Sequence, residues 1–289
     1  MLYHSMIERY HIINSRERIM SNKKNSIERL KVYLVIVIAL IAVLLILPIP
    51  VKLLDIIMAM NLAFALAILV MALNAKTKAD MPLFPTTVLI STIISLAINI
   101  SAARIVLVKG ADFNGYLICH AGSLMTGFGR INLYAGLAVF ITIYLSIILF
   151  IAKGATRIAE VAVRFTLDSL PGKQMAIDIA FSTGSISMKE AETKKDNIMK
   201  ELDFICALDG AGKFFFGNAK AGIIILAAIL IGGSAIDHFV RGNTINNAIE
   251  TYAFLAIGYG LLSIAPVFLV SMAAGIVVAK EAGGKDQIL

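Results

Sequence analysis

Two groups of charged residues in this sequence have types and spacing suited to ion-dependent contacts. Asp168 lies before a Pro171-Gly172 pair, and Lys173 and Asp178 follow it. Proline followed by glycine fits the central positions of a tight turn. A charged trio beside a rigid turn suits ion-sensitive contacts between neighbouring subunits. Structural ion pairing is the alternative.

The second group lies on either side of the first. Asp209 and Lys213 have the i, i+4 spacing of a helical pair just before an apolar segment, and we interpret Asp209 as functional. The alternative is a helix stabilised by a few tenths of a kcal/mol. Arg157, Glu160 and Arg164 also have helical spacing and could order the segment against another subunit. Anchoring by positive charge at the cytoplasmic face is the alternative.

The composition identifies the molecule that positions these charges as an integral membrane protein. Hydrophobic residues make up 59% and charged residues 16% of the 289 residues, and the mean hydropathy is +0.86. A helix needs about 20 apolar residues to cross the bilayer. We therefore predict an all-α, polytopic helical bundle of about six transmembrane helices with one cytoplasmic loop subdomain.

The apolar segments divide the chain into five regions. Spans are predicted at residues 32–47, 53–73, 84–108, 131–152, 219–236 and 251–279. The expected regions are an N-terminal segment (1–31), a first group of transmembrane helices (32–152), a polar loop (153–218), a second group (219–280) and a short tail (281–289).

The distribution of Lys and Arg predicts the orientation. Basic residues concentrate in the N-terminal segment, after the second span and in the 153–218 loop, and short basic loops tend to remain cytoplasmic. Both termini and that loop are therefore expected in the cytoplasm. The net charge of +7 therefore reflects topology. The sequence lacks a basic face interleaved with aromatic residues, which argues against a nucleic-acid partner.

Local signals add detail to the loop and the third span. Gly184 predicts a break, and Ser187 with Glu190 forms a capping box that begins an amphipathic helix over 188–205. Asn99 and Arg104 lie five positions apart in the third span, on different faces. Polar residues inside a membrane span tend to be functional, and membrane anchoring is the alternative for Arg104.

Enzymatic signatures are missing from the sequence. It contains no HExxH, GxSxG, dinucleotide fingerprint or Cys-His cluster, which argues against an enzyme. Cys119 and Cys206 are predicted on opposite sides of the membrane and lack metal-site spacing. We expect no cofactor and no metal.

Several segments resemble one known family in the same order. The loop reads RIAEVAVRFTLDSLPGKQMAID and then DFICALDGAGKFFFGNAKAGIII. The third span contains PLFPTTVLISTIISLAINISAARIVLV, and the sixth contains TYAFLAIGYGLLSIAPVFLVSMAAGIVV. Together they resemble the FHIPEP family of type III secretion export-gate proteins over roughly residues 32 to 280.

The resemblance implies a role in protein export across the bacterial inner membrane. A family member would form a homo-nonameric ring and help couple ion motive force to secretion. Asn99 and Arg104 match the family's third span, so the resemblance makes them candidates for ion coupling or subunit contacts. Its partners would be the other membrane subunits of the gate, the secretion ATPase complex, the secreted proteins and the lipid bilayer. The family's last two spans and its cytoplasmic receptor domain have no counterpart in this sequence.

Some polar positions depart from the family pattern. Ser95 stands where the third span usually has Arg, Tyr259 where the sixth span usually has Asp, and Ala180 and Asn218 replace expected acids. Lost intramembrane charges weaken the case for intact ion coupling. Two alternatives stay open. The intramembrane polar residues could belong to an autonomous ion transporter or channel, and the lost acids and missing C-terminal half could indicate a truncated, non-functional relative of the export gate.

Overall fold

A computed structural model describes residues 49–75, 83–127, 130–151 and 156–283, together with the single residues 39, 44, 47, 81 and 154. Residues 1–47 and 48–289 form separate compact units. The N-terminal segment, nearly all of the first predicted span and residues 284–289 of the tail lie outside the described residues.

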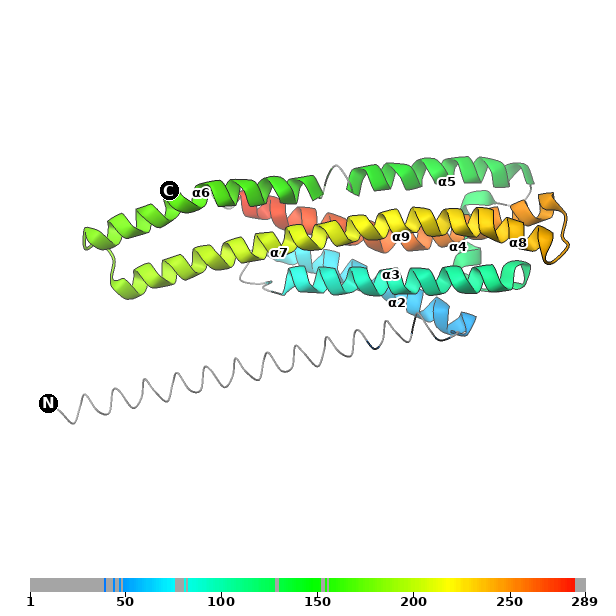
Figure 1. The fold of residues 1–289 in the computed structure, drawn as a ribbon, viewed down its shortest axis with the longest axis horizontal. Coiled ribbons are helices and arrows are strands. Elements are labelled where there is room, and N and C mark those ends of the chain that lie inside the picture. Colours follow the sequence, from blue (N-terminus) through cyan, green and yellow to red (C-terminus); the bar gives the residue numbers. More distant parts are fainter. Residues whose placement is uncertain are drawn as a thin grey trace, which may run out of the picture. The chain divides into compact units, whose positions relative to one another are not determined.

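The described part of the second unit is a series of helices with no strands (Figure 1). The helices, in chain order, are α2 (Val51–Asn74), α3 (Phe84–Lys109), η2 (Gly110–Asp112), α4 (Tyr116–Thr126), α5 (Arg130–Phe150), α6 (Thr156–Ser182), α7 (Met188–Ala227), the π-helical turn η4 (Ala228–Gly232), α8 (Gly233–Phe239) and α9 (Ile245–Gly283).

Five helical segments are long and apolar enough to cross a membrane. They correspond to the second to sixth predicted spans, which confirms the helical membrane class. Many large apolar side chains on α2 and α5 are exposed, including Ile56, Met60 and Leu149. Such surfaces suit contact with lipid because hydrocarbon does not penalise exposed apolar groups.

Helix α9 lies at the centre of the packing. It contacts α2, α4, α5, α7 and α8 and buries Tyr252 and Tyr259 completely. Small residues allow close approach: a Cβ on Gly258 would collide with the backbone carbonyl of Ile118 in α4. Van der Waals packing of this kind stabilises helix pairs in lipid, where the hydrophobic effect does not.

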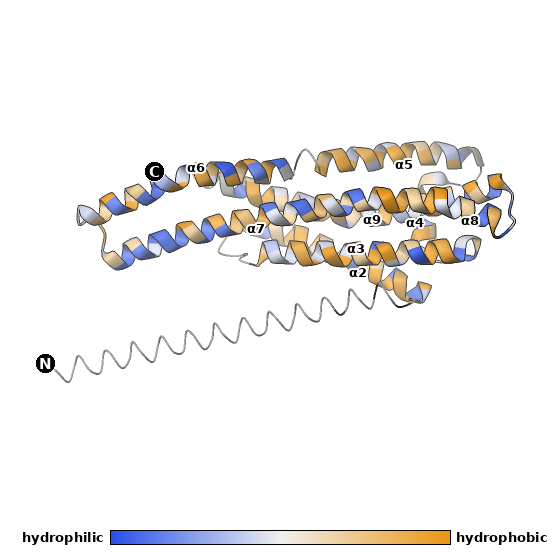
Figure 2. Cartoon of the chain, in the orientation of Figure 1, coloured by the Kyte–Doolittle hydropathy of each residue, from blue (hydrophilic) through white to orange (hydrophobic). Residues whose placement is uncertain are grey.

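The described part of the polar 153–218 segment contains a helical hairpin built from α6 and the first half of α7. Helix α7 begins at Met188 as predicted but continues through the predicted loop end to Ala227. Its 40 residues correspond to about 60 Å, twice the thickness of the hydrocarbon core. Figure 1 shows the hairpin extending past the ends of α2 and α3, and Figure 2 shows hydrophilic residues concentrated near its tip.

Candidate functional site

The α6–α7 hairpin carries most of the predicted site residues. Its turn has Gly184 at φ 75°, a conformation that favours glycine. The backbone amide of Ser187 donates to Glu190 Oε2 at 2.8 Å, and the amide of Glu190 donates to Ser187 Oγ at 3.3 Å. The predicted break and capping box are both confirmed.

The predicted turn at Pro171 and Gly172 is wrong. Both residues are exposed and lie inside helix α6, which continues to Ser182. A proline in a helix interior costs about 3 kcal/mol because it removes a hydrogen bond and crowds the preceding turn. The inner face of α6, with Thr166 and Ile177 buried, packs along α7. Tertiary packing therefore outweighs the local preference for a turn.

Two members of the charged trio form ion pairs within the hairpin. Lys173 Nζ lies 3.4 Å from Glu201 Oε2, and Lys195 Nζ lies 2.6 Å from Asp178 Oδ1. Both pairs join α6 to α7 in antiparallel register. Partly exposed pairs of this kind contribute about 0.2–1 kcal/mol each. Structural pairing therefore describes Lys173 and Asp178, whereas Asp168 is exposed on α6.

The predicted Asp209–Lys213 pair is present where the hairpin meets the apolar half of α7. Lys213 Nζ donates to Asp209 Oδ2 at 2.8 Å. The side chain of Asp209 is 16% exposed and that of Lys213 is 65% exposed. Glu160 on α6 adds a second negative charge near Lys213. The result is a mostly shielded carboxylate paired with a lysine whose side chain reaches into solvent.

The remaining predicted residues lie on two other surfaces. Arg157, Glu160 and Arg164 are exposed on α6. Asn99 is buried in α3, and Arg104 is half-buried on the same helix. The structure thus groups Asp209, Lys213 and Glu160, and it places the α3 residues outside the hairpin.

Comparison with known proteins places this architecture in a family. The model of the FHIPEP family matches residues 41–288, which include the hairpin and all five membrane-length helices. The chain belongs to the FHIPEP family. No solved structure matches it.

Three relatives of this FHIPEP chain are flagellar biosynthesis proteins called FlhA. The one from Borreliella burgdorferi is 41% identical over 73% of this chain and 30% of its own length. Those from Caulobacter vibrioides and Salmonella typhimurium are 40% and 37% identical, each over 75% of this chain and 31% of the relative. The chain thus spans about 30% of the length of the curated relatives it matches.

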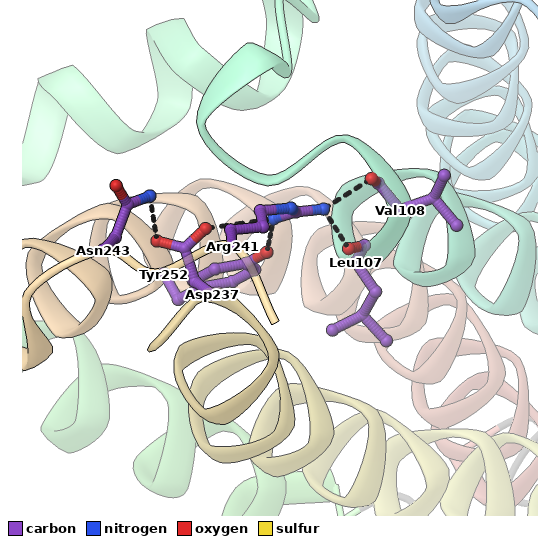
Figure 3. Close-up of polar contacts among 6 residues, drawn as sticks. All are labelled: Leu107, Val108, Asp237, Arg241, Asn243 and Tyr252. Atoms are coloured by element: carbon purple, nitrogen blue, oxygen red, sulfur yellow. Dashed lines mark hydrogen bonds and ion pairs between the residues drawn. The ribbon is translucent and has the colours of Figure 1, made fainter. Parts of the chain in front are cut away.

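The FHIPEP chain also contains a polar network that the sequence analysis did not predict (Figure 3). This Arg241 network comprises Asp237, Arg241, Asn243, Tyr252 and the carbonyl groups that end α3. Arg241 Nη1 donates to Asp237 Oδ1 at 3.1 Å and to Tyr252 Oη at 2.8 Å. Asn243 Nδ2 donates to Asp237 Oδ2 at 3.0 Å.

The same guanidinium caps the C-terminus of α3. Arg241 Nη2 donates to the carbonyl oxygens of Leu107 at 3.2 Å and Val108 at 2.6 Å. Gly110, at φ 54°, lies directly beside it, and a Cβ there would collide with Nη1. A positive charge at a helix C-terminus is favourable because it opposes the negative end of the helix dipole.

Two further charges cap helix ends over long sequence distances. Lys280 Nζ donates to the carbonyl oxygens of Ala72, Leu73 and Ala75 at 3.0, 2.6 and 2.9 Å, which satisfies the C-terminus of α2. Asp55 accepts hydrogen bonds from the backbone amides of Tyr116 at 2.8 Å and Leu117 at 3.3 Å, at the start of α4. The i, i+4 spacing of Asp237 and Arg241 was the one sequence signal for these contacts.

Proposed function

We propose that this chain is the membrane part of a bacterial type III protein export gate and helps couple ion motive force to protein export. The main support is its membership of the FHIPEP family across both the polar hairpin and the membrane helices. The names of its relatives favour a flagellar system, and an injectisome is the other possibility within the same export class.

The proposed location is the bacterial inner membrane, with both termini and the α6–α7 hairpin in the cytoplasm. The clustering of Lys and Arg in the N-terminal segment and the hairpin supports that orientation. The proposed assembly is a homo-oligomeric ring in contact with other gate subunits, the secretion ATPase complex and exported proteins. Exposed Arg157, Arg164 and Asp168 on α6 supply surface charges for contacts between copies.

Asp209 is the residue we assign to ion coupling. Its carboxylate is shielded from solvent, and its partner Lys213 is exposed enough to move away. Protonation of the carboxylate or binding of a cation would compete with Lys213 for the same oxygen atoms. Such competition would weaken the Asp209–Lys213 pair, which lies where the polar half of α7 meets its apolar half.

Secretion assays in a strain lacking its native FHIPEP subunit test the proposal. The chain would be expressed alone and fused to the receptor domain of a relative, and exported protein would be measured in the medium. We expect secretion from the fusion, and a reduction of at least about tenfold, equivalent to about 1.4 kcal/mol, from Asp209→Asn. Asp203→Asn, an exposed carboxylate on the same helix, is the matched control.

Three results would each contradict one part of the proposal. A correctly inserted fusion that exports nothing would remove the export role. Equal secretion from the Asp209→Asn and Asp203→Asn fusions would remove the coupling role of Asp209 alone. The native mass of the detergent-solubilised chain tests the ring: we expect one large, uniform species, and a monomer would contradict it.

A further inference from the structure

Four buried polar side chains lie in the region where α5, α7 and α9 pack together. They are Tyr144 on α5, Asn218 on α7, and Tyr259 and Ser263 on α9, none of them more than 3% exposed. Among the described residues, the hydroxyls of Tyr144 and Tyr259 and both amide atoms of Asn218 have no hydrogen-bond partner. Buried polar groups nearly always have one, so this cluster needs an explanation.

The polar groups converge around Gly222 of α7. A Cβ at this glycine would lie 2.5 Å from Tyr144 Oη and 3.8 Å from Ser263 Oγ. Ser263 lies one helical turn after Tyr259, and its hydroxyl interacts with both phenols, although neither contact has the geometry of a hydrogen bond. Asn218 is one turn before Gly222 on the same buried face of α7. Hydroxyl groups of α5 and α9 therefore meet beside Gly222, and Asn218 lies one turn away on the same face of α7.

Asn218 interrupts an otherwise apolar seam on α7. The buried residues Phe204, Leu208, Ala211, Phe215, Asn218 and Gly222 follow one another at alternating intervals of four and three. Such a pattern is normally filled by apolar side chains. An asparagine amide has two N–H donors and one carbonyl acceptor, and leaving them unpaired inside a membrane protein is costly.

We propose that Tyr144, Asn218, Tyr259 and Ser263 form a binding site for water inside the helix bundle. Hydroxyl and amide groups both donate and accept hydrogen bonds, and a buried water needs two to four such partners. All four side chains are neutral. A metal cation would therefore have no carboxylate among them to balance its charge, whereas water needs none. The site does not depend on the proposed export function.

Hydroxyl-radical labelling of the full chain in lipid nanodiscs tests this site. Radiolysis of a bound water oxidises the side chains around it, even where radicals from bulk solvent cannot reach. Tyr252 is the matched control because it is also fully buried but its hydroxyl is bonded to Arg241. We expect labelling of Tyr144 and Tyr259 to exceed that of Tyr252 at least fivefold, and Asn218→Leu to remove most of the excess.

The thermal stability of phenylalanine variants supplies a second test, because the change in Tm has opposite signs for a hydrated and a dry cluster. If water bonds to the hydroxyls, Tyr144→Phe and Tyr259→Phe each remove a satisfied group, and Tm falls by about 2 °C or more. If the cluster is dry, each variant removes an unpaired hydroxyl and Tm rises. Tyr134→Phe, on the exposed surface of α5, should leave Tm unchanged.

The proposal is overturned by either of two results. One is labelling of Tyr144 and Tyr259 no greater than that of Tyr252. The other is a rise in Tm for both phenylalanine variants. Since both measurements use the purified chain, neither result depends on whether the chain supports secretion.

Discussion

The α6–α7 hairpin and the Arg241 network both use charged side chains, but they use them differently. In the hairpin, Lys195 and Asp178 are 46% and 60% exposed and pair with each other in solvent. In the network, Asp237 is 1% exposed, and Arg241 bonds both to it and to the backbone at the end of α3. Hairpin charges can therefore exchange partners, whereas those of the network hold distant segments in place.

The largest expected effect comes from breaking the Arg241 network. Arg241→Ala leaves Asp237 buried without its counter-charge and uncaps α3, so we expect a loss of about 3–5 kcal/mol in the free energy of unfolding. Unfolding of the purified chain in detergent measures it. Arg164→Ala removes an exposed arginine from α6 and is the control. Equal losses in the free energy of unfolding from both variants would show that the charged residues of the hairpin and the Arg241 network contribute equally to stability.

Glycine substitutions sharpen the comparison with effects of opposite sign. Gly110→Ala places a Cβ against Arg241 at a positive φ, so we expect a loss of about 1–3 kcal/mol. Gly172→Ala meets nothing within 4 Å inside α6 and should stabilise the chain by about 0.5–1 kcal/mol. Thermal unfolding distinguishes them. Stabilisation by Gly110→Ala would contradict the packing of Arg241 described here.

A double-mutant cycle on the Lys195–Asp178 pair of the hairpin should give a small coupling free energy. Lys195→Ala, Asp178→Ala and the double variant are expected to give a coupling of about 0.2–1 kcal/mol because both side chains are well exposed. The coupling should weaken further as salt is added. A coupling above about 2 kcal/mol, insensitive to salt, would mean that this pair is shielded as the Arg241 network is.

Thiol labelling compares exposure in the hairpin with partial burial in the bundle. Burial, with a smaller effect of the Asp55 charge, raises the pKa of the Cys119 thiol, so less reactive thiolate is present at neutral pH. Cys206 in the hairpin is exposed. We expect maleimide to label Cys206 faster near pH 7, and the difference to narrow as pH rises toward the pKa of Cys119. Cys119→Ser and Cys206→Ser variants separate the two labelling rates. Equal rates near pH 7 would contradict the partial burial of Cys119 and the exposure of Cys206.

The sequence predicted features whose causes are local. The capping box at Ser187 and Glu190 and the Asp209–Lys213 pair depend on residues within four positions of each other. Apolar runs of sufficient length likewise predicted the membrane helices, because the bilayer thickness sets a length that composition reveals.

The features that the sequence did not reveal depend on residues far apart in the chain. Helix α6 continues through Pro171 because it packs along α7, which a local turn preference cannot indicate. Lys280 caps α2 across more than 200 positions, and Arg241 caps α3 across more than 130. The unpartnered groups of Asn218 and Tyr259 become visible only when three helices are placed together.

The unbroken course of α7 has a mechanical consequence. A continuous helix from Met188 to Ala227 is stiff along its axis. A displacement of its end at the hairpin tip would therefore also move its other end inside the bundle. A force applied at Met188 would be transmitted past Asp209 to the level of Asn218 with no break in the helix between them. The first change in helical winding is the π-helical turn Ala228–Gly232, so bending of this helix is expected at that turn.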